Sequence, residues 1–227
     1  MKSTLLSTLF FFVSFFSIAQ TSSLDPVDVQ GWYGVGLGID FPKKWTTVVG
    51  YQARFQNNLA SYKGSYISFS GAKLVSKQVE LVAEYRFAKV ENTTYHRFSG
   101  GAEYSPKVKR IDLGFRILVL NNIQDFFDPT RANKKSAFWR ARVKTAYKLT
   151  KNWDGYLSTE PVMEFGATNI IDNWRNTIGF KRKIAPGVKL DIYYMYRPDY
   201  SKASYNRTFH VLGLNIDFKV KPKKKLK

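Results

Sequence analysis

Two histidines and one nearby serine are the residues whose types could support acid–base chemistry. His96 lies near the outer end of a predicted strand, with Ser99 three residues later. A lipid-modifying membrane enzyme would place a histidine beside a serine near the membrane surface. In a strand, however, a spacing of three directs two side chains to opposite faces, so a proton relay would need a bulge. His210 has no evident partner in the sequence. We expect both histidines to be interfacial, and we keep a lipid-modifying enzyme that uses His96 as an alternative.

Carboxylates are the other candidates for chemistry. Five of them could form an acid–base pair, namely Glu80, Glu84, Glu103, Glu160 and Glu164. Each is expected to lie near an inward cation, which favours charge pairing over catalysis. Asp125, Asp128 and Asn133 could ligate calcium, but they lack the compact alternation of a calcium loop. The chain has no Cys, no His/Cys metal spacing and no Gly-rich phosphate loop. We therefore predict no catalytic residues, no metal site and no cofactor.

The stretch from Ser136 to Phe165 indicates which elements carry these charges. Its two arms, SAFWRARVKTAYKL and WDGYLSTEPVMEF, are separated by TKN and alternate with a period of two. Such a period sends one set of side chains to each face of a sheet. Both arms exceed the roughly 5–6 residues usual for soluble strands and suit the ~9–11 residues of a bilayer-spanning strand. One face is almost wholly apolar and the other is ionic, which is typical of a transmembrane β-barrel wall.

Folding the hairpins about their turns predicts which charges meet. A turn about Lys151 places Arg142 opposite Glu160 and Lys148 opposite Asp154. The same construction at three other turns predicts the pairs Lys73–Glu80, Glu103–Arg110 and Lys181–Asp191. Cross-strand pairs of opposite charge contribute about 0.2–1 kcal/mol each, enough to tune register. The charges predicted to face the lumen, as structural or pore-lining groups, are Glu80, Glu84, Arg86, Arg97, Glu103, Arg110, Asp112, Arg116, Arg140, Arg142, Lys144, Asp154, Glu160, Glu164, Arg175, Lys181 and Asp191.

Eleven strand-like runs are clear, joined by connections that alternate between short and long, as in outer-membrane barrels. They cover residues 31–41, 45–56, 63–75, 78–89, 94–105, 108–120, 136–149, 153–165, 172–184, 188–197 and 206–220. Bacterial single-chain barrels have an even number of strands. We therefore predict an all-β, antiparallel up-and-down transmembrane barrel of about 12 strands, with 10 as the alternative. Residues 21–30 forming a poor strand, an N-terminus inside the lumen or a wrongly divided run would each explain the odd count.

Residues 1–19 have the features of a secretory signal peptide, and residues 20–227 are expected to form one barrel domain with a basic C-terminal tail. Lys2 precedes an apolar run over 5–16, and small residues Ser17 and Ala19 precede the expected cleavage point. No later stretch of 18 apolar residues occurs, which excludes helical spans. The formal charge of +19 includes Lys2, so cleavage leaves 19 − 1 = +18. Export argues against nucleic acid as the partner. We predict membrane lipid instead, above all lipopolysaccharide, and the outer membrane of a Gram-negative bacterium as the location.

Several segments resemble a family of small outer-membrane β-barrels with no assigned function. They are AEYRF at 83–87, GGAEY at 100–104, RARVKTAYKLTKNW at 140–153 and LDIYYMYRPD at 190–199, and the similarity covers the whole mature chain. The resemblance implies a barrel and no catalytic residues. The terminal strand ending at Phe218 resembles that of other barrels, which implies recognition by the barrel assembly machinery; a nine-residue tail follows it.

These observations predict a structural or interaction protein, or a narrow channel, with a charge-filled lumen. An excess of inward cations would make such a pore conduct anions. Two alternatives remain open. One is the lipid-modifying enzyme, and the other is a soluble periplasmic β-sandwich that binds a ligand.

Overall fold

The computed structural model describes residues 27–125, 135–166, 171–200 and 207–220. The predicted signal peptide, residues 1–19, lies outside these ranges, as do Asp128, Asn133 and the basic tail. No helix in the described ranges is long and apolar enough to cross a membrane.

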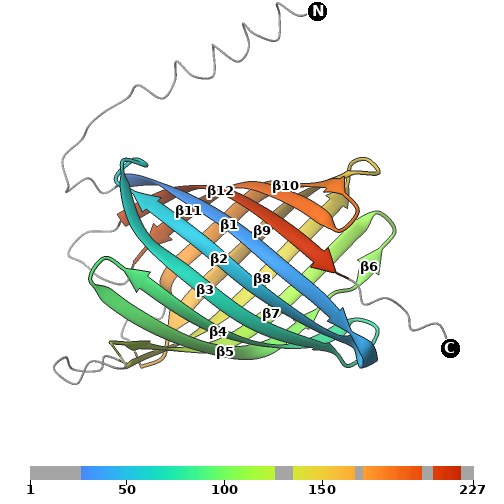
Figure 1. Ribbon diagram of the computed structural model, residues 1–227, viewed down its shortest axis with the longest axis horizontal. Coiled ribbons are helices and arrows are strands. Elements are labelled where there is room, and N and C mark those ends of the chain that lie inside the picture. Colours follow the sequence, from blue (N-terminus) through green and yellow to red (C-terminus); the bar gives the residue numbers. More distant parts are fainter. Residues whose placement is uncertain (1–26, 126–134, 167–170, 201–206, 221–227) are drawn as a thin grey trace, which may run out of the picture.

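The described chain is built almost entirely of strands of 12 to 15 residues (Figure 1). Their bounds are β1 Val27–Phe41, β2 Trp45–Gln56, β3 Ser61–Leu74, β4 Val79–Val90, β5 Thr93–Tyr104, β6 Lys107–Val108, β7 Ile111–Gln124, β8 Lys135–Lys148, β9 Trp153–Glu164, β10 Ile171–Ala185, β11 Val188–Asp199 and β12 Arg207–Val220. A single 3-10 turn, η2 at Pro42–Lys44, joins β1 to β2. The runs predicted from period-two alternation thus match the strands closely.

The strands form one closed barrel. Neighbours in sequence pair antiparallel, β5 pairs with β7, and the ring is completed between β1 and β12. The two-residue β6 pairs only with β7, so eleven long strands make the wall. Closure satisfies the backbone groups that an open edge would expose. The prediction of an all-β barrel of about twelve strands is confirmed.

The odd number of long strands is accommodated by a parallel pair. Strands β1 and β12 run in the same direction, from Val27 opposite Thr208 to Ile39 opposite Val220. A ring of alternately directed strands must contain one such pair when its number is odd. Residues 27–30 extend β1 and form no separate strand.

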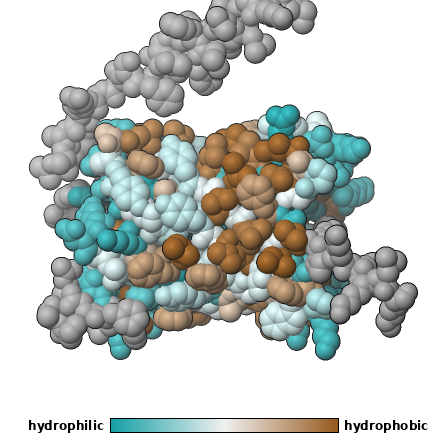
Figure 2. Space-filling view, in the orientation of Figure 1, coloured by the Kyte–Doolittle hydropathy of each residue, from teal (hydrophilic) through white to brown (hydrophobic). Residues whose placement is uncertain are grey.

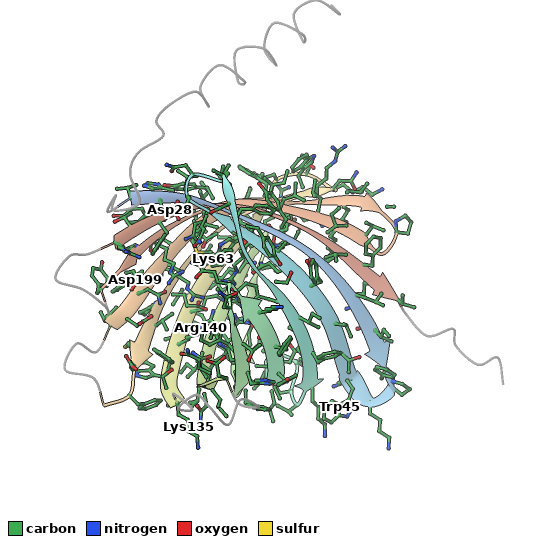
Figure 3. All side chains as sticks on the ribbon, turned by 60° about the vertical axis from the view of Figure 1, so that its left-hand side comes forward. Asp28, Trp45, Lys63, Lys135, Arg140 and Asp199 are labelled. Carbon is green, nitrogen blue, oxygen red and sulfur yellow. The ribbon has the colours of Figure 1, made fainter. Side chains whose placement is uncertain are left out.

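The two ends of the barrel are called here the loop rim, where β1 begins and β2 ends, and the turn rim, where β1 ends and β2 begins. The connections after β7, β9 and β11 lie at the loop rim, and the chain leaves β12 at the turn rim. In Figure 3, Asp28, Lys63, Arg140 and Asp199 lie toward the loop rim and Trp45 toward the turn rim.

Alternation along each strand separates an apolar outer face from a polar lumen. In β1, Tyr33, Val35 and Leu37 point outward and are more than 40% exposed, whereas Trp32 is buried inside. Ile117 and Leu157 are the most exposed aliphatic side chains of the described residues, at 61% and 59%. Figure 2 shows apolar and weakly polar residues across the middle of one face, with hydrophilic residues at both ends. This is the distribution expected of a wall surrounded by hydrocarbon.

Inward glycines make room for long polar side chains on neighbouring strands. A Cβ at Gly36 would lie 2.7 Å from the Asp217 carboxylate, and a Cβ at Gly179 would lie 2.6 Å from the Tyr156 ring. A Cβ at Gly213 would collide with the ring of Tyr193. The glycines therefore allow rings and acids to lie flat against the inner wall.

Candidate functional site: the charged lumen

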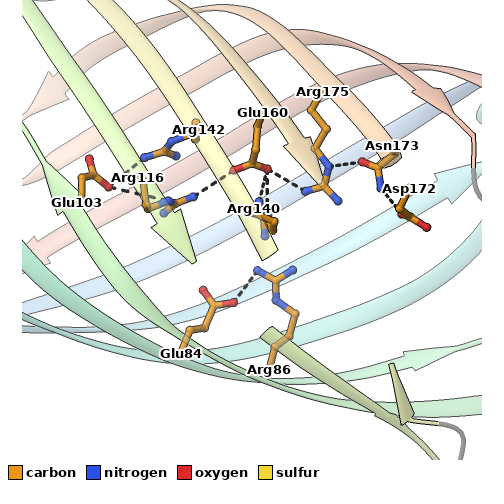
Figure 4. A network of polar contacts seen from close by, with 10 residues as sticks. All are labelled: Glu84, Arg86, Glu103, Arg116, Arg140, Arg142, Glu160, Asp172, Asn173 and Arg175. Carbon is orange, nitrogen blue, oxygen red and sulfur yellow. Dashed lines mark hydrogen bonds and ion pairs between the residues drawn. The ribbon is translucent and has the colours of Figure 1, made fainter. Parts of the chain in front are cut away.

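The centre of the lumen holds a network of ion pairs around Glu160 (Figure 4). Arg140 donates to Glu160 Oε1 from Nη2 and from Nε, the latter at 3.0 Å. Arg175 Nη1 lies 3.4 Å from the same oxygen, and Arg116 Nη2 lies 3.7 Å from Oε2. The Glu160 side chain is only 6% exposed. One buried carboxylate from β9 therefore holds arginines from β7, β8 and β10.

A second carboxylate, Glu103 on β5, extends this network. Arg142 Nη2 donates to Glu103 Oε2 at 3.0 Å, and Arg116 Nε lies 4.0 Å from the same oxygen. Arg116 and Arg142 are directly opposite one another on β7 and β8. Like charges in that position repel, so Glu103 lowers the cost of their proximity. The small Gly114 of β7 lies beside Glu103 and leaves space for this contact.

A third group lies closer to the turn rim. Lys181 Nζ lies 3.3 Å from Asp191 Oδ2, and the Tyr156 hydroxyl donates to Asp191 Oδ1 at 2.9 Å. Lys144 Nζ lies 4.1 Å from the centroid of the Tyr156 ring. Asp154 is directly opposite Lys181 on one side and Lys148 on the other. Charges of opposite sign thus alternate around this level of the barrel.

The lumen near the loop rim contains a cavity of about 260 Å³, called here the mouth cavity. Among its lining residues are six arginines from six strands and one carboxylate, Asp172. The arginines are Arg54, Arg86, Arg97, Arg140, Arg175 and Arg197. This end of the lumen is therefore strongly cationic.

A second cavity of about 220 Å³, called here the wall cavity, lies along the small residues of β1, β2 and β3. Gly36, Gly50 and Ser68 form its floor. Tyr66 and Arg86 line both cavities. The two cavities therefore adjoin at Tyr66 and Arg86, and the wall cavity lies on the β1–β3 side, opposite the ion pairs of β8–β10.

Most of the charges predicted from the sequence are brought together in these groups, but four stand apart and a fifth, Asp154, lies opposite two lysines without forming an ion pair with either. Arg110 and Asp112 are exposed at the turn rim, where residues 109–112 turn from β6 into β7. Glu80 lies at the same rim, opposite Leu74 and Glu103. Glu164 lies at the loop rim opposite Phe138, and Asp154 makes no ion pair within 4.0 Å with any described residue. Arg97 pairs with an amide: its Nε donates to Asn122 Oδ1 at 2.6 Å.

Two of the predicted pairings are present at their turns. Lys181 is opposite Asp191, and Lys148 is opposite Asp154, as expected. The pairing of Glu103 with Arg110 is wrong, because β6 lengthens the connection and Glu103 lies opposite Arg116.

One other predicted pairing is also wrong. Lys73 lies opposite Leu81, since the β3–β4 register differs by one residue, and its Nζ lies 5.2 Å from the Trp45 ring. The register of β8 and β9 on both sides of Arg142 is the predicted one, with Arg140 opposite Val162 and Val143 opposite Thr159. The Arg142 guanidinium nevertheless reaches Glu103 across β7, while Glu160 takes Arg140 and Arg175.

Two lumen arginines are missing from the sequence prediction. Arg54 of β2 has its Cζ 3.6 Å from the ring centroid of Trp32 and 3.9 Å from that of Tyr66. Arg197 of β11 pairs with Asp199 at 3.1 Å. Both side chains point into the lumen, because they alternate along their strands with outward-facing residues: Val49 and Tyr51 in β2, and Ile192 and Tyr196 in β11. This alternation predicts that both arginines face the lumen. Neither, however, has an acidic residue opposite it next to a short turn.

The histidines lie on the outer face of the barrel. His96 is directly opposite Phe87, and its Nδ1 lies 2.8 Å from the Tyr85 hydroxyl. Ser99 points the other way, with its Oγ donating to the Glu84 carbonyl at 3.5 Å. His210 has the same setting: it is opposite Tyr196, and its Nδ1 lies 2.6 Å from the Tyr194 hydroxyl. His96 and Ser99 therefore do not form a proton relay.

Metal-binding groups of three or more His, Cys, Asp or Glu do not occur within the described residues. Asp125, one of the calcium candidates, accepts a hydrogen bond from the Thr94 backbone N–H at 3.1 Å. The other two candidates lie outside the described ranges.

The fold of this chain is similar to that of a solved porin structure. The solved structure of the NanC porin in a rhombohedral crystal form matches with a TM-score of 0.57 and 12% identity, covering 85% of this chain and 99% of that one. OccK8 (OprE) of Pseudomonas aeruginosa gives a TM-score of 0.38 and 8% identity over 74% of this chain and 57% of that one. A search of curated proteins found no match. A family model described as "Protein of unknown function (DUF2490)" matches residues 29–208, and the chain belongs to that family.

Proposed function

We propose that this protein is a narrow outer-membrane channel through which small anions pass. The observation that carries the proposal is the mouth cavity, where six arginines and a single carboxylate line the lumen. Rings of charged side chains set the selectivity of pores, and cationic rings favour anions.

The outer face supports placement in a membrane. Strands of 12 to 15 residues, tilted as in Figure 1, span roughly 30 Å at about 3.3 Å per residue, the thickness of a bilayer's hydrocarbon core. Aromatic side chains such as Phe41, Trp45 and Phe218 are exposed at the turn rim, and Tyr62 and Phe165 at the loop rim. Exposed aromatics at both ends of an apolar band match interfacial girdles.

The path for ions is proposed to follow the β1–β3 side of the lumen. The Glu160 network fills the opposite side with paired side chains, while the lining of the wall cavity includes three glycines and Ser68 beside larger side chains such as Asp217. Arg86 lies between the two cavities and pairs with Glu84 at 3.0 Å. An anion that leaves the mouth cavity therefore meets Arg86 before it reaches the small-residue wall.

Planar-bilayer recording tests this path with two neighbouring substitutions. Ser68→Trp would fill the wall cavity, and we expect it to reduce single-channel conductance severely. Ile67→Trp is the matched control, because Ile67 is on the outer face and 40% exposed; it should leave conductance unchanged. Equal conductance in both variants would refute the path, and no current from the unmodified protein at high voltage would favour a filled, structural barrel.

We also propose anionic lipid headgroups as the membrane partner, contacting the turn rim. Many exposed cations lie at or near that rim: Lys43, Lys44, Lys77, Lys109, Arg110, Lys148, Lys151, Arg182, Lys183, Lys189 and Lys219. In outer-membrane barrels the short turns are periplasmic, so this charge would contact anionic phospholipid of the periplasmic leaflet. Lipopolysaccharide would contact the loop rim, where exposed Lys89, Lys135 and Arg207 lie.

A further inference from the structure

The mouth cavity contains more positive charge than its surroundings compensate. Arg86 is paired with Glu84, Arg197 with Asp199, and Arg140 and Arg175 share Glu160. These pairs account for four of the six arginines that line the cavity.

The remaining two arginines have only neutral partners among the described residues. Arg54 Nε donates to the Gln52 side-chain oxygen at 2.8 Å, and Arg97 Nε donates to Asn122 Oδ1 at 2.6 Å. In both, the amide acceptor takes the inner nitrogen and leaves the terminal nitrogens of the guanidinium for a ligand. Two positive charges therefore face one cavity without a carboxylate of their own.

The Arg54 guanidinium is also held in a fixed orientation. It lies against the rings of Trp32 and Tyr66, with its Cζ 3.6 and 3.9 Å from their centroids. Trp32 is itself buried, and its Nε1 donates to the Gln30 side chain at 3.2 Å. Stacking fixes the plane of the guanidinium while its edge stays available. A donor that is already oriented loses less entropy when it binds.

We propose that the mouth cavity is a binding site for a small, doubly charged oxyanion, a phosphate monoester or a dicarboxylate, held between Arg54 and Arg97. Guanidinium groups bind carboxylate and phosphate oxygens in two-point contacts, and two guanidinium groups that have only amide partners suit the two charges of a dianion. The cavity of about 260 Å³ is smaller than the roughly 300–1,000 Å³ of pockets for drug-sized ligands, so the ligand is small. This site deepens the proposed anion channel and rests on it for its physiological meaning.

The test is binding to the full-length, detergent-solubilised protein, because binding does not require current. Inorganic phosphate and succinate are titrated separately by calorimetry at a pH where both are largely dianionic, with acetate as the singly charged comparison. We expect at least one dianion to bind at least about tenfold (~1.4 kcal/mol) more tightly than acetate, because its second charged group adds hydrogen bonds to a guanidinium. The two titrations distinguish a phosphate site from a dicarboxylate site.

Three variants locate the site. Arg97→Gln and Arg54→Lys should each remove most of the preference for dianions, the second because lysine keeps the charge and loses the two-point geometry. Arg110→Gln, at the opposite rim, should bind as the unmodified protein does. Heat-dependent gel migration identifies any variant that fails to fold. If Arg97→Gln or Arg54→Lys fails to fold, the remaining one of these two variants provides the test.

Equal affinity for acetate and both dianions, or a preference that survives both Arg97→Gln and Arg54→Lys, would overturn the site. Dianion preference without bilayer current would support the site and contradict the channel. Bilayer current without dianion preference would support the channel and contradict the site.

Discussion

Arg140 directs two nitrogens of its guanidinium, Nε and Nη2, at the same carboxylate oxygen of Glu160. That oxygen also lies 3.4 Å from Arg175 Nη1. The Glu160 carboxylate thus contacts arginines from three strands, β7, β8 and β10, and we expect the stability of this side of the barrel to depend on it.

Glu160→Gln should destabilise the barrel strongly. Removing one partner of a buried ion pair leaves the others uncompensated, which costs on the order of 3 kcal/mol. The measurement is the urea midpoint of unfolding in lipid vesicles. Glu164→Gln is the control, on the same face of β9 but at the rim, and it should change the unfolding free energy by less than about 0.5 kcal/mol. Equal effects of the two substitutions would contradict the central role of Glu160.

The parallel seam predicts a specific disulfide. Val35 and Ile216 are partners in the β1–β12 pair, and the chain contains no native Cys. Adjacent strands place Cα atoms within the 4.4–6.8 Å that a disulfide requires. The double variant Val35→Cys/Ile216→Cys should therefore cross-link on mild oxidation, as seen by faster migration of the unfolded protein in gels.

Its control is Val35→Cys/Leu212→Cys, in which the second cysteine is four residues away along β12. This pair should remain reduced. Cross-linking of the control in preference to the test pair would show that β1 and β12 meet in another register or direction.

The cationic turn rim predicts a preference for anionic phospholipid. The protein should be more stable to heating in vesicles containing phosphatidylglycerol than in phosphatidylcholine alone, because each exposed cation near the surface contributes about 1 kcal/mol of attraction. Raising the salt concentration should remove the difference, since headgroup attraction is screened.

Replacing Lys43 and Lys44, which lie together in the η2 turn, by Gln should weaken that preference. Replacing Lys89 and Lys135 at the loop rim is the matched comparison and should not. A larger effect at the loop rim would show that this rim makes the stronger contact with anionic headgroups and would contradict the assignment to the turn rim.

The strands and the faces of this barrel could be predicted from alternation, but the register could be predicted only in part: the β3–β4 and β8–β9 connections have the same length, and the register is as predicted only at the second. The predicted pair Lys181–Asp191 is present, but the turn alone does not set it: Ala185 lies opposite Val188 at the turn, and a β-bulge between Lys183 and Ala185 shifts the register by one residue. Between Tyr104 and Ile111 the chain forms β6, which shifts Glu103 from Arg110 to Arg116. The alternation within a strand does not indicate whether the connection after it forms a further short strand such as β6.

The residues of the candidate site could be predicted from the sequence only in part, for a similar reason. Glu160 and Arg140 were predicted to face the lumen from the parity of their own strands. Arg54 and Trp32 come together only because β1 lies beside β2 with Trp32 opposite Arg54, and the sequence prediction relied on pairs of opposite charge. The parallel pairing of β1 with β12 could not be predicted either. The alternation within a strand indicates which side chains share a face, but not the direction of the strand beside it.

The sign of the reversal potential across a gradient of potassium chloride tests the central claim most directly. With the protein in a planar bilayer and more salt on one side, an arginine-lined lumen should pass chloride in preference to potassium, and the reversal potential should take the sign of an anion current. Arg97→Gln should move it toward zero. A reversal potential with the sign of a potassium current in the unmodified protein would contradict the account.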